Sequence, residues 1–220
     1  MKRVLFIFLF FISISTLLAQ EINSIISVHD GQKYKIVKIG NQWWMAENLI
    51  ATKYNDGTLI PLVTDVTTWS KLITPGYCWY ANDSIAYSSP YGALYNWYAV
   101  NTGKLCPTGW HVPTDAEWTV LSDYLGGTNI AGSKLKEIGT THWLSPNSKA
   151  TNEIGFTSLP GGNRNFDGTY YNLGYYGYWW TSTEYSSTNA YNRYMFYNNS
   201  SIFGFSHLKK YGFSVRCVKD

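Results

Sequence analysis

The chain has 220 residues, with 17 basic and 14 acidic side chains and a formal net charge of +3 at pH 7. Two of the basic residues stand at positions 2 and 3, so 15 basic residues face 14 acidic ones in the rest of the chain. That balance, together with the lack of a basic run, argues against nucleic-acid binding. Aromatic residues make up 18% of the chain, which indicates a folded domain because disordered segments lack aromatic rings.

The first twenty residues, MKRVLFIFLFFISISTLLAQ, have the three-part layout of a secretory signal peptide. Lys2 and Arg3 precede an apolar run, and Ala19 is a small residue at the expected cleavage point. A membrane anchor is the alternative, but a spanning helix needs roughly 20 apolar residues and this run is shorter. We therefore expect a signal peptide over residues 1–19, export to the medium or the cell surface, and no membrane span after cleavage.

Residues 20–33 form a polar lead-in to the first predicted element. The stretch KYKIVKIGNQWWMAENL then predicts a β-hairpin with strands over residues 34–39 and 42–45. Gly40-Asn41 supplies the turn, because these residue types tolerate the backbone angles of tight hairpin turns.

We expect residues 60–76 to form a loop and GYCWYAN, residues 76–82, to form a short aromatic strand around Cys78. The stretch YGALYNWYAVNTG, residues 91–103, predicts the first main helix, because its apolar residues share one helical face.

A second main helix is predicted in CPTGWHVPTDAEWTVLSDYLGG. Thr114 is the expected N-cap and Glu117 completes a capping box with it. Trp118, Leu121 and Leu125 form the expected buried stripe, and the following Gly-Gly pair ends the helix. The capping role gives Glu117 a structural task, which we favour over a role as general acid.

The stretch GSKLKEIG, residues 132–139, predicts one more short helical piece. Beyond it the chain predicts strands and long loops, with strand-like stretches GFTSLPGG, YWWTSTEY, RYMFY and GFSVRCVKD. The sequence has no repeat of fixed period and no linker-like change in composition, which indicates a single domain.

The three cysteines are Cys78, Cys106 and Cys217. In an oxidising compartment two of them pair and one is left over, and the sequence allows each of the three pairings. Three free buried thiols are the alternative.

Several motifs, in chain order, resemble the Fibrobacter succinogenes major paralogous domain family over residues 34–219: GNQWWMAENL, GYCWY, GALYNWYAV, CPTGWHVPTDAEW, LPGGNR, YGYWWTSTE and SVRCVKD. That family is similar to the C-type lectin-like fold of the sulfatase-modifying, formylglycine-generating enzymes. The resemblance implies an α+β domain with two main helices, small antiparallel sheets, long loops, and adjacent N- and C-terminal strands. It implies no activity, because the family has no generally established one and a fold does not decide function.

The resemblance also implies a disulfide between Cys106 and Cys217, because a helix packs against the closing strand in a lectin-like fold. Cys78 is then left as a buried thiol among aromatic residues. The related oxidases depend on a cysteine pair near the end of the chain, where this sequence has only Cys217. Their activity is therefore not carried over to this chain.

The sequence indicates no metal centre and no cofactor. The histidines stand singly and far apart, at His29, His111, His142 and His207. Calcium is the one ion with a partial signal, because NRNFDG places Asn163, Asn165 and Asp167 at alternating positions before a glycine. The twelfth position of such a loop is Gly174 rather than an acid, so we interpret NRNFDG as a plain turn.

The stretch TYYNLGYYGYWWTSTEY is the densest aromatic block of the chain. Its rings either build the core, Trp179 and Trp180 especially, or contact a glycan or a protein, for which tyrosine and tryptophan are well suited. We predict ligand contacts by neighbouring amide, carboxylate and tyrosine side chains: Asn163, Asp167, Tyr170, Tyr171, Asn172, Tyr175 and Tyr176.

The favoured functional hypothesis is an exported, non-catalytic binding module whose partner is a polysaccharide or a surface protein. One alternative is a glycan-active hydrolase, which needs two carboxylates facing each other across a cleft. Its candidate acids are Glu117, Glu153, Asp167 and Glu184. A structural component of a cell-surface assembly is the other alternative.

Overall fold

The structure is a computed structural model that describes residues 22–26 and 31–220. The expected signal peptide over residues 1–19 and His29 lie outside the described residues. Within the described part, no helix is both long and apolar enough to cross a bilayer. The architecture is α+β, as expected, with two five-stranded sheets, a two-stranded sheet and short helices.

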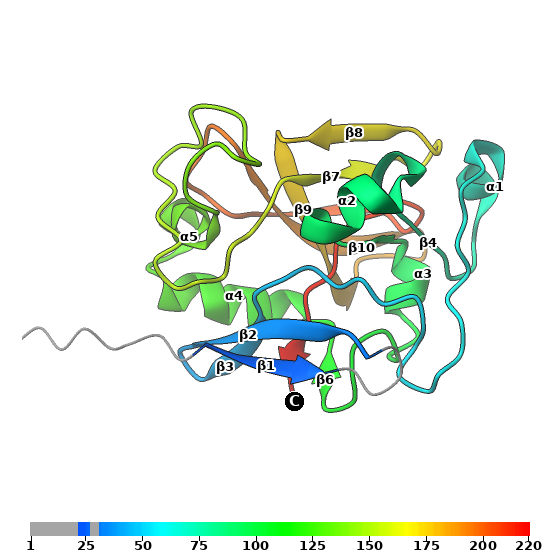
Figure 1. The fold of residues 1–220 in the computed structure, drawn as a ribbon, viewed down its shortest axis with the longest axis horizontal. Helices are drawn as coiled ribbons and strands as arrows, with labels where there is room; N and C mark the ends of the chain where they lie inside the picture. The colour runs from blue at the N-terminus through cyan, green and yellow to red at the C-terminus, as the bar shows by residue number, and fades with distance from the viewer. Residues whose placement is uncertain (1–21, 27–30) are drawn as a thin grey trace, which may run out of the picture.

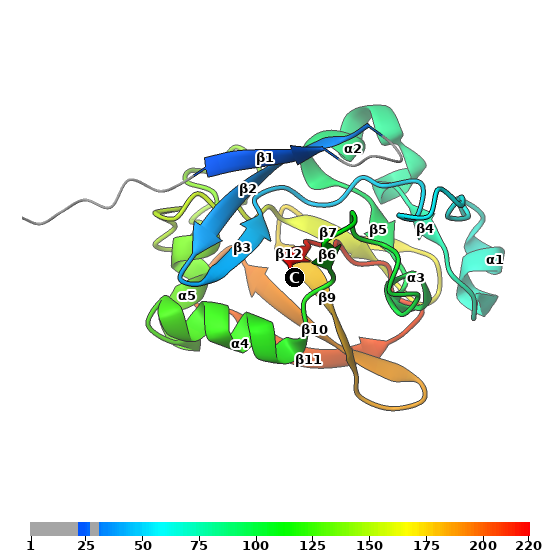
Figure 2. The same cartoon turned by 90° about the horizontal axis from the view of Figure 1, so that it is seen from below.

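The first sheet is built around the predicted hairpin and has the strand order β1-β2-β3-β12-β6. Its strands are β1 (Ile22–Ile26), β2 (Lys33–Ile39), β3 (Gln42–Met45), β6 (Trp110–His111) and β12 (Val218–Lys219). The hairpin prediction is confirmed, with Val37 opposite Trp44. On its other side, Trp44 pairs with Val218 of β12. This pairing confirms that the last strand joins the N-terminal hairpin. Figure 2 shows β12 and β6 together beside the C-terminus.

The second sheet has the strand order β11-β10-β9-β7-β8. Its strands are β7 (Gly161–Arg164), β8 (Tyr170–Leu173), β9 (Tyr176–Glu184), β10 (Asn189–Phe196) and β11 (Phe203–Leu208). Neighbouring strands are antiparallel except β7 and β9, which meet in parallel at Gly162 and Gly177. Figure 1 shows this sheet above the hairpin sheet, with α4 and α5 at one side of the molecule.

Helix α4 (Asp115–Tyr124) forms as predicted, and both halves of the capping box are present. The Thr114 hydroxyl accepts a hydrogen bond from the Glu117 backbone at 3.2 Å, and the Glu117 carboxylate accepts one from the Thr114 backbone at 2.7 Å. Trp118 and Leu121 are fully buried. The Trp118 ring lies 4.8 Å from Trp44 and 6.2 Å from Trp179, so α4 packs against both sheets.

The described residues contain five short α-helices, so the two main helices and one short piece expected from the sequence do not account for all of them. The predicted loop 60–76 contains α1 (Val66–Lys71), whose N-cap Asp65 accepts a hydrogen bond from the Thr68 backbone at 2.7 Å. Helix α2 (Ser84–Tyr91), which Asp83 caps, was not predicted from the sequence either.

The helix predicted over residues 91–103 is wrong in its first half. Leu94–Tyr95 form strand β5, which pairs with β4 (Tyr77–Cys78), and Tyr95 also exchanges backbone hydrogen bonds with Phe213. Tyr91 is the last residue of α2, and after it only α3 (Trp97–Val100) is helical. Pairing with distant strands therefore overrides the local helical pattern.

Two further boundaries differ from the sequence-based expectation. Helix α5 covers Thr128–Leu135, so it begins before the predicted piece 132–139 and ends within it. The predicted closing strand GFSVRCVKD is regular only at Val218–Lys219, while Phe213 and Ser214 make isolated bridges to Tyr95 and Trp179.

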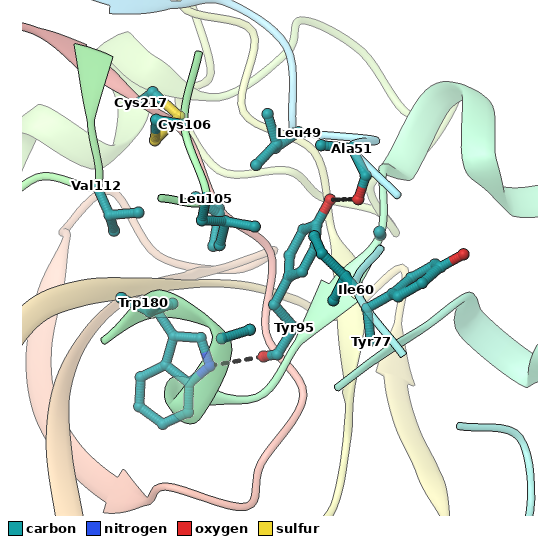
Figure 3. Packing of buried hydrophobic residues seen from close by; sticks show 14 of the residues in the cluster. Leu49, Ala51, Ile60, Tyr77, Tyr95, Leu105, Cys106, Val112, Trp180 and Cys217 are labelled. Carbon is teal, nitrogen blue, oxygen red and sulfur yellow. Dashed lines mark hydrogen bonds between the residues drawn. A yellow bond between two sulfur atoms is a disulfide. The ribbon is translucent and has the colours of Figure 1, made fainter. Parts of the chain in front are cut away.

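Both sheets contribute to the same hydrophobic clusters. Figure 3 shows one of them, in which the Tyr95 hydroxyl donates to the Ala51 carbonyl at 2.7 Å. The Trp180 indole in turn donates to the Tyr95 carbonyl at 2.8 Å. The Tyr95 hydroxyl and the Trp180 indole are thus satisfied by backbone carbonyls, which keeps the burial of these two groups favourable.

The disulfide joins Cys106 and Cys217 and lies at one end of the cluster in Figure 3. Their Cα atoms are 6.0 Å apart, within the range that a disulfide spans. The pairing implied by the resemblance is therefore confirmed. Cys78 is a free, fully buried thiol, also as expected, and burial raises its pKa to about 11.

Candidate functional site

One face of the second sheet carries partly exposed aromatic side chains. Successive side chains of a strand point to opposite faces, so Tyr176 and Tyr178 of β9 share one face while Trp179 points to the other. The register places Tyr178 opposite Tyr194 and Tyr176 opposite Phe196 on β10. Since cross-strand partners share a face, these four rings lie together.

The rings line two adjoining hollows, with volumes of about 280 and about 510 Å³. The hollows share Asn172, Tyr178 and His207, so we treat them as one feature and call it the aromatic groove. Its lining comes from β7 to β11 and the segments beside them, and consists of Asn163, Asn165, Tyr171, Asn172, Tyr176, Tyr178, Tyr194, Phe196, Phe205, His207, Tyr211 and Phe213.

The rings of the aromatic groove stack on one another rather than lying in one plane. Tyr176 and Tyr178 are stacked with centroids 5.5 Å apart and planes 12° apart. Tyr178 is stacked in the same way on Phe213 at 4.9 Å. Phe205 makes an edge contact with His207 at 5.2 Å and is 57% exposed. It is therefore the most accessible ring for a ligand on this face.

An amide and phenol network lies where the two hollows join. The Asn172 side-chain nitrogen donates to the Asn163 side-chain oxygen at 2.9 Å and to the Tyr178 hydroxyl at 3.4 Å. Burial raises the pKa of Tyr178, so its phenol stays protonated and can donate to a ligand. The network thus offers donors and acceptors in the middle of an otherwise aromatic lining.

His207 contributes an acceptor at the same junction. Burial lowers its pKa from 6.5 to about 4, so the ring is neutral near pH 7. Its Nδ1 atom lies 2.7 Å from the side-chain oxygen of Asn192, which only accepts hydrogen bonds. The proton is therefore on Nδ1, and Nε2 carries a lone pair.

The structure brings four of the seven predicted ligand residues together in the aromatic groove: Asn163, Tyr171, Asn172 and Tyr176. Trp179 and Trp180, by contrast, are fully buried. The groove also contains residues that the sequence analysis did not select, above all Tyr194, Phe196, Phe205 and His207. These residues could have been recognised from the rings at alternating positions in RYMF and FGFSH, two stretches outside the densest aromatic block.

The other three predicted ligand residues do not line the groove. The Tyr170 ring lies 5.3 Å from Tyr80, and its hydroxyl donates to Asn82 at 2.7 Å. Tyr175 is 47% exposed and packs edge-on against Tyr197. Asp167 accepts from the backbone and hydroxyl of Thr169, at 2.9 and 2.5 Å.

The oxygen atoms of the partial calcium motif serve the β7–β8 turn. The Asn163 oxygen accepts from Asn172, the Asn165 oxygen accepts from the Phe166 backbone at 2.9 Å, and Asp167 accepts from Thr169. The interpretation of NRNFDG as a turn therefore agrees with these contacts. Within the residues that the structure describes, no group of three or more His, Cys, Asp and Glu side chains is placed to hold a metal ion.

A third cavity, of about 710 Å³, lies between the β2–β3 hairpin, the end of α2 and the segment after α5. Its wall includes two acids that the sequence analysis did not consider, Glu47 and Glu137. His142 Nδ1 lies 2.8 Å from both carboxylate oxygens of Glu137. The wall also includes the guanidinium of Arg216, which is 1% exposed and donates to the Asn48 side chain at 2.9 Å. We call this the charged cavity.

None of the four acids proposed for a hydrolase lines these three cavities. Glu117 belongs to the capping box, and Asp167 to the turn described above. Glu153 pairs with Lys134 at 3.0 Å, and Glu184 pairs with Lys209. The structure therefore gives each of the four a local partner and brings no two of them to a common cavity.

The comparisons with known proteins bear on the family alone. A family model described as Fibrobacter succinogenes major domain matches residues 37–219. No curated protein and no solved structure matches the chain. The family description names a domain and no activity.

Proposed function

Because the chain belongs to the Fibrobacter succinogenes major domain family, whose description names no activity, we propose a function from the geometry of the aromatic groove. The protein is an exported, non-catalytic binding module that holds a polysaccharide or a surface protein in this groove. The observation that carries the proposal is the assembly of partly exposed rings and an amide–phenol network on one sheet face. Apolar surface with a few fixed polar groups is the usual make-up of a ligand site.

Two features outside the groove support export. The apolar run between Lys2 and Ala19 has the layout of a signal peptide. The disulfide between Cys106 and Cys217 suits an oxidising compartment, since cytosolic thiols are kept reduced. Detection of the protein in the medium or on intact cells, cleaved after Ala19, tests this part of the proposal by mass spectrometry of its N-terminus.

We also propose that the scaffold is C-type lectin-like. Support comes from the pairing of the hairpin with the last strand and from the disulfide beside it. An experimental structure that superposes on a C-type lectin-like domain with the same strand connectivity is the expected result. A different connectivity would contradict this assignment without affecting the proposed binding role.

The binding role is tested with exposed rings inside and outside the groove. Replacing Phe205 by alanine removes the most exposed groove ring, and we expect about threefold to tenfold weaker binding in affinity electrophoresis on a polysaccharide panel. Tyr185→Ala is the matched control, because Tyr185 is 58% exposed and does not line the groove. Equal retardation of both variants and the parent protein would contradict a binding role for this groove.

A second candidate function, hydrolysis, is favoured by the charged cavity. The Glu137 carboxylate contacts Nδ1 of His142, so Nε2 faces away from the carboxylate. Carboxylate–histidine pairs in hydrolases use the second ring nitrogen as the base in the same way. Glu47 is the second acid of this cavity and accepts from the Lys35 backbone at 2.9 Å. In this hydrolase hypothesis, Glu47 and Glu137, which share one cavity, take the place of the four acids suggested by the sequence.

The hydrolase version is tested with chromogenic glycosides and esters. It requires a turnover that Glu137→Gln and His142→Gln abolish and that Glu153→Gln, an acid outside the cavity, leaves unchanged. If the purified protein turns over none of these substrates, the hydrolase version fails and the binding module stands. Cross-linking and pull-down from intact cells separate the third possibility, a structural part of a surface assembly, from a glycan-binding module.

A further inference from the structure

We propose that the ligand of the aromatic groove is a neutral, hydroxyl-rich polysaccharide chain that runs through both hollows. This inference rests on the proposed function and names its ligand class. Its basis is the composition of the lining, since none of the residues around the two hollows is Lys, Arg, Asp or Glu. A binding surface for an acidic or sulfated glycan needs cations to replace the water that the anion loses.

Three ionisable groups of the groove, His207, Tyr178 and Tyr194, are also uncharged near neutral pH. Burial keeps the pKa of His207 at about 4, so the imidazole is neutral. Burial raises the pKa of Tyr178, and burial followed by the neighbouring Tyr176 raises that of Tyr194. The groove therefore presents hydroxyl groups, amides and a neutral imidazole between aromatic rings.

The strands that build the groove do carry charged residues, but these are partnered elsewhere. On β10, Arg193 points to the opposite face and donates to the Asp115 carboxylate of α4 at 2.7 Å. On β7, Arg164 is fully buried and donates to the Val63, Thr64 and Gly168 carbonyls. The neutral lining thus results from how the side chains are placed and does not reflect a lack of charge in the strands.

The segment after β11 shows the same arrangement. Lys209 is 6% exposed, contacts the Glu184 carboxylate and donates to the Ser187 carbonyl at 2.9 Å. Its ammonium also lies 4.7 Å from the Trp97 ring centroid. Lys210 donates to the Ser70 carbonyl at 2.9 Å. Both cations next to the groove are therefore engaged with groups outside its lining.

The groove matches the two kinds of surface that a sugar ring has. The apolar faces of sugar rings contact aromatic side chains, while their hydroxyl groups need both donors and acceptors. The Tyr178 phenol is a donor, and Nε2 of His207 and the Asn163 oxygen are acceptors. A protein partner is the less favoured occupant, because a protein interface surrounds an apolar core with a polar rim, whereas here the polar groups lie in the middle of the aromatic lining.

The full chain is tested by affinity electrophoresis in gels with neutral polysaccharides (β-glucan, mannan, unsubstituted xylan) and anionic ones (polygalacturonate, alginate, dextran sulfate). We expect retardation by at least one neutral polysaccharide, none by the anionic ones, and the same retardation at low and high salt. Salt independence follows because screening weakens only interactions between charges.

Tyr178→Phe keeps the groove ring and removes its hydroxyl, so we expect roughly threefold to tenfold weaker binding of the neutral polysaccharide. Tyr185→Phe removes a phenol outside the groove and is expected to bind like the parent protein. Circular dichroism and thermal unfolding of both variants check that the fold is retained.

Four outcomes overturn the inference. Retardation by anionic polysaccharides that disappears at high salt contradicts a neutral ligand. Tyr178→Phe that binds like the parent protein contradicts a ligand at this groove. Neither result contradicts the proposal that the protein is a binding module. The neutral-glycan inference also fails if a purified apolar peptide or protein binds, Phe205→Ala abolishes that binding, and no glycan binds. Failure to bind any glycan or protein overturns both this inference and the proposed function.

Discussion

His111 lies between two carboxylates, and this placement sets its charge. Its Nδ1 atom is 2.6 Å from the Asp220 carboxylate, and its Nε2 atom is 2.8 Å from that of Glu117. Both ring nitrogens can donate only when the imidazole is protonated. Burial alone lowers the pKa of His111, but the hydrogen bonds to Asp220 and Glu117 outweigh it and raise the pKa above 6.5.

This geometry predicts a pH window for stability. Because the folded pKa of His111 is raised, its stabilising effect is complete below about pH 6.5 and is lost as the pH rises through the folded pKa. Burial raises the pKa of Glu117, but the hydrogen bonds from Thr114 and His111 outweigh it, and the net pKa lies below 4.5. The contribution of Glu117 is therefore present above about pH 4.5 and is lost as the pH falls through its folded pKa.

The measurement is urea unfolding of the parent protein and His111→Gln at a series of pH values. We expect the difference in unfolding free energy to be largest between about pH 4.5 and 6.5, and to decrease above that range. Asp220→Asn leaves His111 with the Glu117 carboxylate alone, so the difference in unfolding free energy should begin to decrease at a lower pH. A difference that stays constant over the whole series would show that the ion pairs do not govern this contribution.

At the scale of elements, Asn48 joins segments that are far apart in the chain. It follows β3, is 4% exposed, and its side-chain oxygen accepts from the Trp179 indole and the Arg216 guanidinium, both at 2.9 Å. Its side-chain nitrogen donates to the Tyr91 carbonyl at 2.7 Å and to the Ser214 hydroxyl at 3.3 Å. One buried amide thus forms hydrogen bonds with groups from β9, the end of α2 and the segment just before β12.

Replacing Asn48 by alanine is predicted to cost on the order of 3 kcal/mol of unfolding free energy. The reason is that the indole and the guanidinium lose their shared acceptor while they stay buried. Chemical denaturation measures the effect, and Asn198→Ala, at an exposed asparagine, is the control with an expected change near zero. A loss no larger than that of the control would mean that water or another group replaces the amide.

For the molecule as a whole, the disulfide connects the segment before α4 to the last strand. Cys106 and Cys217 are 111 residues apart in the sequence, and both belong to a hydrophobic cluster to which both sheets contribute. A link of this length restricts the unfolded chain strongly, by about 4 to 5 kcal/mol in the loop-entropy model.

Replacement of both Cys106 and Cys217 by alanine is therefore predicted to lower the unfolding free energy by about 4 to 5 kcal/mol. Reductant should lower the stability of the parent protein by a similar amount and leave the double variant unchanged. Cys78→Ala removes the free buried thiol and should cost less, on the order of 1 kcal/mol. A parent protein whose stability does not respond to reductant would contradict the presence of the disulfide.

Interactions between residues close in the chain could be predicted from the sequence. The Gly40-Asn41 turn set the register of the hairpin, and Thr114 and Glu117 set the beginning of α4. The buried stripe of α4 and the burial of Trp179 and Trp180 also agree with the expectation. These features depend on side-chain periodicity and on contacts within one turn of helix or hairpin, which the order of residues determines directly.

Only the tertiary structure decided the remaining features. Tyr95 has a helical pattern around it but pairs with Phe213, and Tyr170 and Tyr175 belong to the predicted aromatic block but lie outside the groove. The groove takes residues from β7 to β11, and the neutral state of His207 follows from its burial there. Such features depend on which distant strands become neighbours, and local periodicity carries no information about that choice.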